Sequence, residues 1–323
     1  MLPATKSARF PTLSLFLVRH AESQNNAINA RYAAQAWEKY LRSPDPDLSA
    51  AGDAQIAKLE AFVRSSERLT AAALREAARA EHDNDSRFLF FSSPMRRALK
   101  TSSALAKGLS YAGVIVDPTC FEEGGCYHDH VDMSDMKGLA RLEAMSDPEL
   151  EQLKQATGQR TTFPGLTAAD VLDPSTLSAH LNVTPETASF VKEVLPGMES
   201  GWYAAFDRCE TRRECFARAK HFVDKVKAIA MADNADTVVL VSHGDLMDAM
   251  LKNLIGQADV EDRVLDNAIR FAHTNTGITR VEIGKNDGMA HVMVMNESTH
   301  LEATEHTGGE MLDGWGKWRQ HAW

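Results

Sequence analysis

The chain has 323 residues, of which 44% are hydrophobic, so it can bury a full core as one large domain or two ordinary ones. It carries 35 Lys and Arg against 45 Asp and Glu, and the net charge of −10 argues against a protein that binds nucleic acid or an anionic membrane. The 4 cysteines are too few for a disulfide scaffold, and the longest apolar runs are only strand-sized. We therefore expect a cytoplasmic protein without a membrane segment.

Short apolar runs predict the strands of one sheet. The first, Leu13 to Val18, stops at a polar group that begins with Arg19 and His20, as a buried parallel strand does when it ends at a functional loop. Further strands are expected, in chain order, over residues 88–91, 114–116, 237–241, 278–283 and 292–295. A turn signal at residues 285–288 joins the last two as a hairpin.

Amphipathic segments between these runs predict helices over residues 27–41, 52–63, 71–80, 95–109, 211–231 and 246–255. Ser92-Ser93-Pro94 is expected to cap the fourth of them, with the proline in its first turn. The Ala-rich third helix is interpreted as part of a surface insertion at about residues 67–86. Between Glu123 and Ser200 we find short amphipathic pieces and no strand, which predicts an inserted, mainly helical cap at about 124–200.

The alternation of strands and helices predicts a three-layer α/β/α sandwich with a mostly parallel central sheet. In such folds the ligand binds beyond the carboxyl ends of the strands. His20 and His243 directly follow two of the predicted strands, so both imidazoles are expected at one crevice, together with Arg19 and Arg97. Two guanidiniums and the nearby helix N-termini, expected at Pro94 and Leu246, suit a small dianionic phosphate ester.

An imidazole at such a site can attack phosphorus and hold the phosphoryl group covalently, a reaction that needs no metal ion. The leaving alkoxide then needs a proton from a carboxylic acid with a raised pKa, and Glu122 and Glu123 are the candidates.

Several motifs together resemble the histidine phosphatase superfamily, in its phosphoglycerate-mutase-like branch. The segment Leu17-Val18-Arg19-His20-Ala21-Glu22-Ser23 is similar to the Arg-His-Gly signature of that family. Further blocks match in order: residues 48–55, Ser92 to Thr101, Phe121-Glu122, Glu210-Thr211 with Arg218-Ala219, Val241 to Gly244, and Asn275-Thr276. Because the blocks span nearly the whole chain apart from the cap and the tail, the resemblance implies a single catalytic domain over residues 1–323.

The resemblance also implies roles for individual residues. His20 would be the phosphohistidine nucleophile, and Arg19, Arg97 and His243 would surround the phosphate. Glu122, rather than Glu123, would be the proton donor. Contacts to phosphate or substrate would come from Ser23, Asn26 and the backbone amide of Gly244, although Asn26 also suits a helix cap. No cofactor is implied.

Two departures from the family pattern bear on the activity. Ala21 replaces the usual glycine, which is tolerated if the backbone there has ordinary dihedral angles. Residues 122–127 differ from the glutamate loop of glycolytic phosphoglycerate mutases, and the cap lacks their basic substrate-binding segment. The sequence therefore favours a histidine acid-type phosphomonoesterase that acts on a small phosphorylated substrate. A mutase-type isomerase and a binding or regulatory protein with little turnover are the alternatives, and a homo-oligomer is neither predicted nor excluded.

Two further groups of residues are interpreted in less specific terms. Cys120, Cys126, His128, Asp129 and His130 crowd together, but their spacing matches no closed zinc site, which favours a loop that lines the pocket. Arg212, Arg213, Arg218 and Lys220 are expected to form mostly a solvated helix face, from which one cation reaches a substrate carboxylate as the alternative.

Overall fold

A computed structural model of the chain describes residues 11–31, 46–82, 87–117, 119–123, 181–182, 212–256 and 270–308. Nearly all of the predicted cap lies outside these ranges, as do residues 32–41 of the first predicted helix and the group Cys126, His128, Asp129 and His130. None of the helices within the ranges is long and apolar enough to cross a bilayer.

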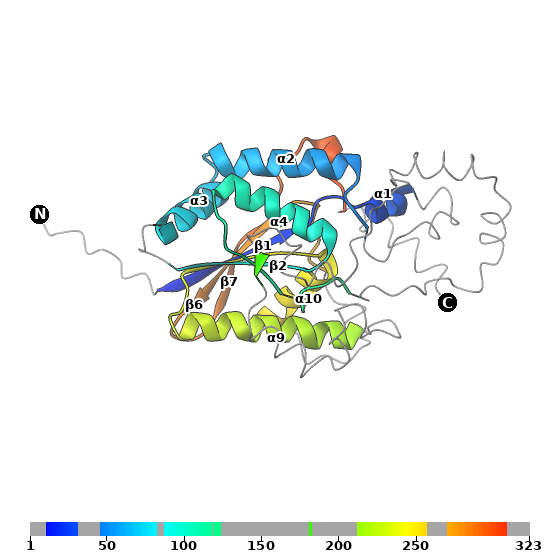
Figure 1. Ribbon diagram of the computed structural model, residues 1–323. Helices are drawn as coiled ribbons and strands as arrows, with labels where there is room; N and C mark the ends of the chain where they lie inside the picture. Colours follow the sequence, from blue (N-terminus) through cyan, green and yellow to red (C-terminus); the bar gives the residue numbers. More distant parts are fainter. Residues whose placement is uncertain are drawn as a thin grey trace, which may run out of the picture.

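A single sheet forms the centre of the molecule (Figure 1). Its strands are β1 (Thr12–Arg19), β2 (Phe88–Ser92), β3 (Val114–Val116), β4 (Leu181–Asn182), β5 (Thr237–Ser242), β6 (Ile278–Gly284) and β7 (Ala290–Glu297). The order across the sheet is β4-β3-β2-β5-β1-β6-β7. The pairs from β4 to β1 are parallel, whereas β6 is antiparallel to both β1 and β7. The prediction of a mostly parallel sheet is confirmed.

Helices cover both faces of this sheet, which completes the predicted three layers. Figure 1 shows α2 (Ala50–Ser65), α3 (Leu69–His82) and α4 (Arg96–Leu109) on one side, and α9 (Arg212–Met231) and α10 (Gly244–Leu254) on the other. A further helix, α1 (Gln24–Arg31), follows β1, and a short 3-10 helix, η4, spans Ala303–Glu305.

The alternation of side chains along β1 explains the two cores. Leu13, Leu15 and Leu17 pack into the cluster under α9 and α10, whereas Phe16 and Val18 pack into the cluster under α2, α3 and α4. All five side chains are at most 1% exposed. Because β1 is buried on both faces, its carboxyl end is held rigidly at Arg19, its last residue, and His20 follows directly.

The boundaries of several elements differ from the predicted ones. The N-cap of α4 is Met95, so Pro94 precedes the helix instead of lying in its first turn, and the Ser93 hydroxyl accepts a hydrogen bond from the Met95 amide (3.2 Å). The N-cap of α10 is His243, so this helix begins before the predicted Leu246. Periodicity marks only the first apolar residue of a helix, and here the first turns are polar or small.

Two other expectations change in the structure. The two-residue strand β4 pairs with β3 inside the region where we expected no strand, since two residues are too short to show any periodicity. The Ala-rich helix α3 buries Ala71, Leu74 and Ala78 in the core, so one of its faces belongs to the body of the fold.

Candidate active site

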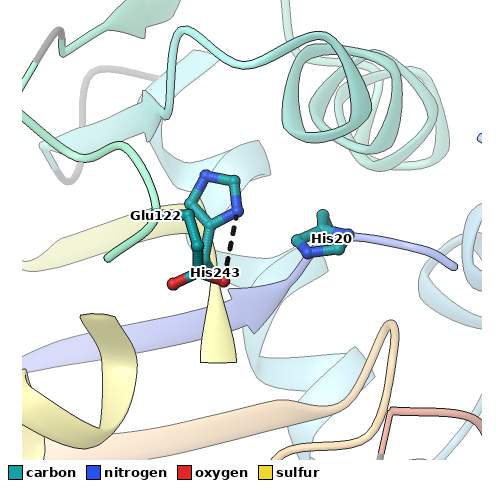
Figure 2. Close-up of side chains that lie close together, drawn as sticks. All are labelled: His20, Glu122 and His243. Atoms are coloured by element: carbon teal, nitrogen blue, oxygen red, sulfur yellow. Dashed lines mark ion pairs between the residues drawn. The ribbon is translucent and has the colours of Figure 1, made fainter. Parts of the chain in front are cut away.

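Three side chains from three separate segments converge beyond the carboxyl ends of β1 and β5 (Figure 2). His20 follows β1, His243 follows β5, and Glu122 lies in the segment after β3. One ligand atom of each lies within 4.8 Å of the others, and the imidazole centroids of His20 and His243 are 5.0 Å apart. The structure therefore brings together the three residues predicted to act on the substrate.

The hydrogen bonds of His20 define the state of its imidazole. Its Nδ1 lies 2.6 Å from the Ala21 carbonyl oxygen, which only accepts, so Nδ1 carries the proton. The Arg97 guanidinium donates from Nε to His20 Nε2 (3.2 Å), so Nε2 holds a lone pair. Burial lowers the pKa of His20 well below its ordinary value, and the charges of Arg97 and Arg19 lower it further. The imidazole is therefore neutral at neutral pH, with Nε2 as its unprotonated nitrogen.

Backbone contacts fix the position of His20. Its amide donates to the Ser242 carbonyl (2.9 Å), and its carbonyl accepts from the Asn275 side-chain amide (2.8 Å). The Thr276 amide donates to the Arg19 carbonyl (3.1 Å), from a residue held at a φ of 59°. A β-branched residue rarely adopts this left-handed conformation. The hydrogen bonds of the loop after residue 270 therefore hold Thr276 in a strained conformation that positions it against the end of β1.

Ala21 has the ordinary backbone that its substitution for glycine requires. The non-glycine residues with positive φ among those described are Ser110, Asp233, Thr276 and Asn296, and Ala21 is not one of them. Its amide donates to the Thr101 hydroxyl (3.0 Å). The methyl group is therefore accommodated without backbone strain.

Arg19 is 4% exposed and is held by main-chain carbonyls that the sequence did not indicate. Its Nη1 donates to the carbonyls of His273 (2.5 Å) and Gly308 (2.9 Å). Gly244 lies against the same guanidinium, since a Cβ at that glycine would be 3.3 Å from Arg19 Cζ. Arg19 and the N-terminus of α10 thus lie side by side, with N–H groups suited to an anion.

His243 is completely buried as the N-cap of α10. A hydrogen bond joins its Nε2 to the Ser93 hydroxyl (2.7 Å), and its Nδ1 lies 3.9 Å from Glu122 Oε2. Burial lowers its pKa well below the ordinary value, and the nearby Arg97 is the next cause. The family resemblance gave Ser93 no role of its own, although it lies within a matching block.

The two candidate proton donors differ in their surroundings. Burial and the nearby Asp245 raise the pKa of Glu122 to about 7, against the opposing effect of Arg97. Glu123 points elsewhere and forms an ion pair with Arg212, which also pairs with Asp248 (3.2 Å). Of the two carboxylates, Glu122 is the one that faces the histidines, and it holds a proton near neutral pH.

Ser23 and Asn26 form the start of α1. The Asn26 side-chain oxygen accepts from the amide (3.1 Å) and the hydroxyl (3.0 Å) of Ser23, and the Asn26 amide donates to the Ser23 hydroxyl (3.2 Å). This reciprocal pattern satisfies the first turn of a helix, as a capping box does. The helix-cap alternative for Asn26 therefore has direct structural support, and a substrate contact from either residue stays a prediction.

The expectation of a solvated face on α9 is wrong for Arg218. This residue is 6% exposed and donates to two backbone carbonyls of the segment that carries Glu122. Arg212 is also largely covered, with 17% of its side chain exposed. Helical periodicity missed both because their hydrogen-bond and ion-pair partners lie on segments far away in the sequence.

His20, Glu122 and His243 also have the residue types that bind a metal ion. The positive charges of Arg97 and Arg19 lower the pKa of the same imidazoles, and they disfavour a dication there for the same electrostatic reason. Burial also raises the pKa of the Cys120 thiol, and the other members of its group, Cys126, His128, Asp129 and His130, lie outside the described residues. The charge at this centre suits an anion.

Comparison with known families agrees with this charge and geometry. Residues 186–296 match the histidine phosphatase superfamily (branch 1). The resemblance predicted from the motifs is thereby confirmed over this stretch. The histidine phosphatase match includes His243, Gly244 and Asn275, and His20 and Glu122 lie N-terminal to it. No curated protein sequence matches the chain.

Several solved structures that align with most of this chain are those of proteins described as phosphatases. A mycobacterial glucosyl-3-phosphoglycerate phosphatase is 18% identical, with 89% of this chain and 100% of that chain covered and a TM-score of 0.44. A phosphoserine phosphatase mutant from Entamoeba histolytica, in complex with phosphoserine, is 15% identical, with 90% and 100% covered and a TM-score of 0.42. A putative α-ribazole-5′-phosphate phosphatase from Escherichia coli is 14% identical, with 88% and 96% covered and a TM-score of 0.43.

Proposed function

We propose that the protein is a phosphomonoesterase that hydrolyses a small phosphorylated substrate through a phosphohistidine on His20. The observation that carries this proposal is the protonation pattern of the site. His20 presents an unprotonated Nε2 beside two guanidiniums, and the carboxyl group of Glu122, whose pKa is raised to about 7, lies across from it. A nucleophile, an anion site and an acid are the three groups that a phosphate ester needs.

In the first step, the dianionic phosphate binds between Arg97 and His20 and breaks the hydrogen bond between Arg97 Nε and His20 Nε2. Its oxygens accept hydrogen bonds from Arg19, Arg97 and the N-terminus of α10. Nε2 attacks phosphorus, the ester P–O bond breaks, and the leaving oxygen takes the proton of Glu122. Charge stabilisation comes from fixed guanidiniums, so this step requires no metal ion. His243 stays neutral and donates a hydrogen bond to the dianionic phosphate through its one ring N–H.

In the second step, water replaces the released alcohol. The Glu122 carboxylate takes a proton from that water while its oxygen attacks phosphorus, the P–N bond breaks, and inorganic phosphate leaves. His20 regains its lone pair and Glu122 its proton, so both groups return to their initial states and the cycle is balanced.

The test is phosphate release from a panel of sugar phosphates, phosphoglycerates, nucleotides and phosphopeptides. We expect release that His20→Ala abolishes and that a chelator leaves unchanged, whereas substitution of the exposed His291 on β7 has no effect. Loss of activity in chelator that zinc restores would contradict the metal-independent chemistry. Interconversion of 2- and 3-phosphoglycerate without phosphate release would instead identify a mutase.

A further inference from the structure

The segment that carries Glu122 has no secondary structure of its own. β3 ends at Val116, and residues 117 and 119–123 continue as turn and irregular backbone. A general acid must keep its carboxyl group within hydrogen-bond reach of the leaving oxygen, so something outside the segment has to fix it. Cys120 and Phe121 are completely buried, and buried carbonyls need donors.

Arg218, on α9, supplies most of that support. Its Nη1 donates to the carbonyls of Thr119 (2.6 Å) and Phe121 (2.8 Å). Its guanidinium also lies over the Phe121 ring, with Cζ 3.6 Å from the ring centroid. One planar side chain therefore holds both the polar and the apolar sides of the segment, immediately before Glu122.

The remaining carbonyl in this run is held from the sheet. The Ser242 hydroxyl donates to the Cys120 carbonyl (3.0 Å), and Ser242 directly precedes His243. The carbonyls of residues 119, 120 and 121 are thus all bound by side chains from α9 or β5. These contacts fix Glu122 relative to His243, which lies 3.9 Å from its carboxylate.

The buried charge of Arg218 acts on the same site. The two hydrogen bonds that Arg218 donates to the segment go to neutral carbonyls. The positive charge is one of the causes that lower the pKa of His243. A neutral side chain that merely filled the space would leave the carbonyls without their donor and the imidazole easier to protonate.

We propose that Arg218 is the positioning residue of the proton donor: it holds the segment 119–121 so that Glu122 reaches the leaving oxygen. This inference rests on the proposed function, since it assigns the residue that makes its acid effective. Arg218 is assigned no contact with the phosphate or with His20, and it affects proton transfer to the leaving oxygen by positioning Glu122.

The experiment compares two esters of similar shape that differ in the basicity of the leaving group, p-nitrophenyl phosphate and phenyl phosphate. Arg218→Met should lower kcat/KM, which reports the attack on the ester and not the later hydrolysis of phosphohistidine, by about tenfold or more for phenyl phosphate. The loss for p-nitrophenyl phosphate should be less than about threefold, because only the phenoxide leaving group needs a proton. Lys220→Met, on the exposed side of the same helix, is the matched control and should leave both rates unchanged.

A double variant separates positioning from general structural damage. If Arg218 acts through Glu122, then Glu122→Gln with Arg218→Met loses little more on phenyl phosphate than Glu122→Gln alone. Arg218→Lys keeps a donor for the carbonyls and should recover part of the rate. If Arg218→Met does not fold, Ser242→Ala provides the same test. It removes only the donor to the Cys120 carbonyl, so the rate on phenyl phosphate should again fall more than the rate on p-nitrophenyl phosphate, but by a smaller factor.

The outcomes distinguish the two proposals. Equal losses on both esters, or additive losses in the double variant, would overturn the positioning role while phosphatase activity stands. If the wild-type protein releases no phosphate from any ester, although a cooperative unfolding transition shows that it is folded, the proposed function and this inference are both overturned.

Discussion

Burial moves the protonation equilibria of the acid and the nucleophile in opposite directions, and both changes favour the proposed reaction. It lowers the pKa of His20, which keeps Nε2 unprotonated, and it raises the pKa of Glu122 to about 7, which keeps the acid protonated. In water near pH 5.5, which lies between the ordinary pKa values of about 4.3 for Glu and about 6.5 for His, the imidazole would be protonated and the carboxyl group ionised. The site therefore has its reactive protonation states in a range that includes neutral pH.

The pH dependence of turnover follows from these directions. Turnover of esters with basic leaving groups should fall as the pH rises through about 7, because Glu122 loses the proton that it donates. Glu122→Gln should hydrolyse such esters more slowly by about a hundredfold or more, and its rate should no longer fall as the pH rises through about 7. Profiles of kcat/KM against pH for phenyl phosphate report the groups of the free protein and check this assignment. A decrease above about pH 7 that survives in Glu122→Gln would assign it to another group.

At the scale of elements, the described strands other than β4 could be predicted from the sequence because each contains a short apolar run. The convergence of His20 and His243 followed from that pattern, since parallel strands end at one edge. The partners of the site could not be predicted in the same way. Arg218 and Gly308 act through main-chain carbonyls, and no periodicity records which carbonyl a distant side chain will meet.

The segment around η4 provides one such main-chain contact to Arg19. The Gly308 carbonyl binds Arg19, and Gln55 in α2 donates to the Glu305 carbonyl (3.0 Å) and the Thr307 hydroxyl (2.9 Å). Gly308 has a φ of 80°, and a Cβ there would lie 2.4 Å from Arg19 Nη1. This close approach requires glycine, so residues 305–308 support the Arg19 guanidinium.

Gly308→Ala should therefore displace Arg19 and lower kcat/KM by about tenfold or more, equally for esters with good and poor leaving groups, since a bound phosphate loses a charge-assisted contact. Gly256→Ala is the matched control: it also has a positive φ, of 78°, but nothing lies within 4 Å of its added Cβ. Both variants should lose about 1 kcal/mol of stability from the backbone strain, and only Gly308→Ala should lose activity. Equal activity in the two variants would exclude the supporting role.

At the scale of the whole molecule, the neutral buried histidines make stability depend on pH. Burial lowers the pKa of His273 to about 3 and that of His300 to about 4, against an unfolded value of 6.5. Below pH 6.5 the unfolded chain binds protons that the folded chain does not, so stability falls as the pH drops from 6.5 toward these folded values.

Urea unfolding at pH 7 and pH 5 measures this loss. The wild-type protein should be less stable at pH 5, with each of these histidines contributing about 2 kcal/mol, and His300→Gln should lose about 2 kcal/mol less than the wild type between the two pH values. His291→Gln, at an exposed position of β7, should behave like the wild type. An identical pH dependence in the two variants would show that His300 does not contribute.

In the proposed reaction, His20 carries the phosphoryl group during turnover. The most direct measurement is mass spectrometry of the protein quenched in alkali during turnover of p-nitrophenyl phosphate, because phosphohistidine is labile in acid. We predict one phosphoryl group, located on the peptide that contains His20, absent from His20→Ala and more abundant in Glu122→Gln, which cannot activate water for the second step. Wild-type turnover with no phosphorylated His20 in either protein would contradict the account.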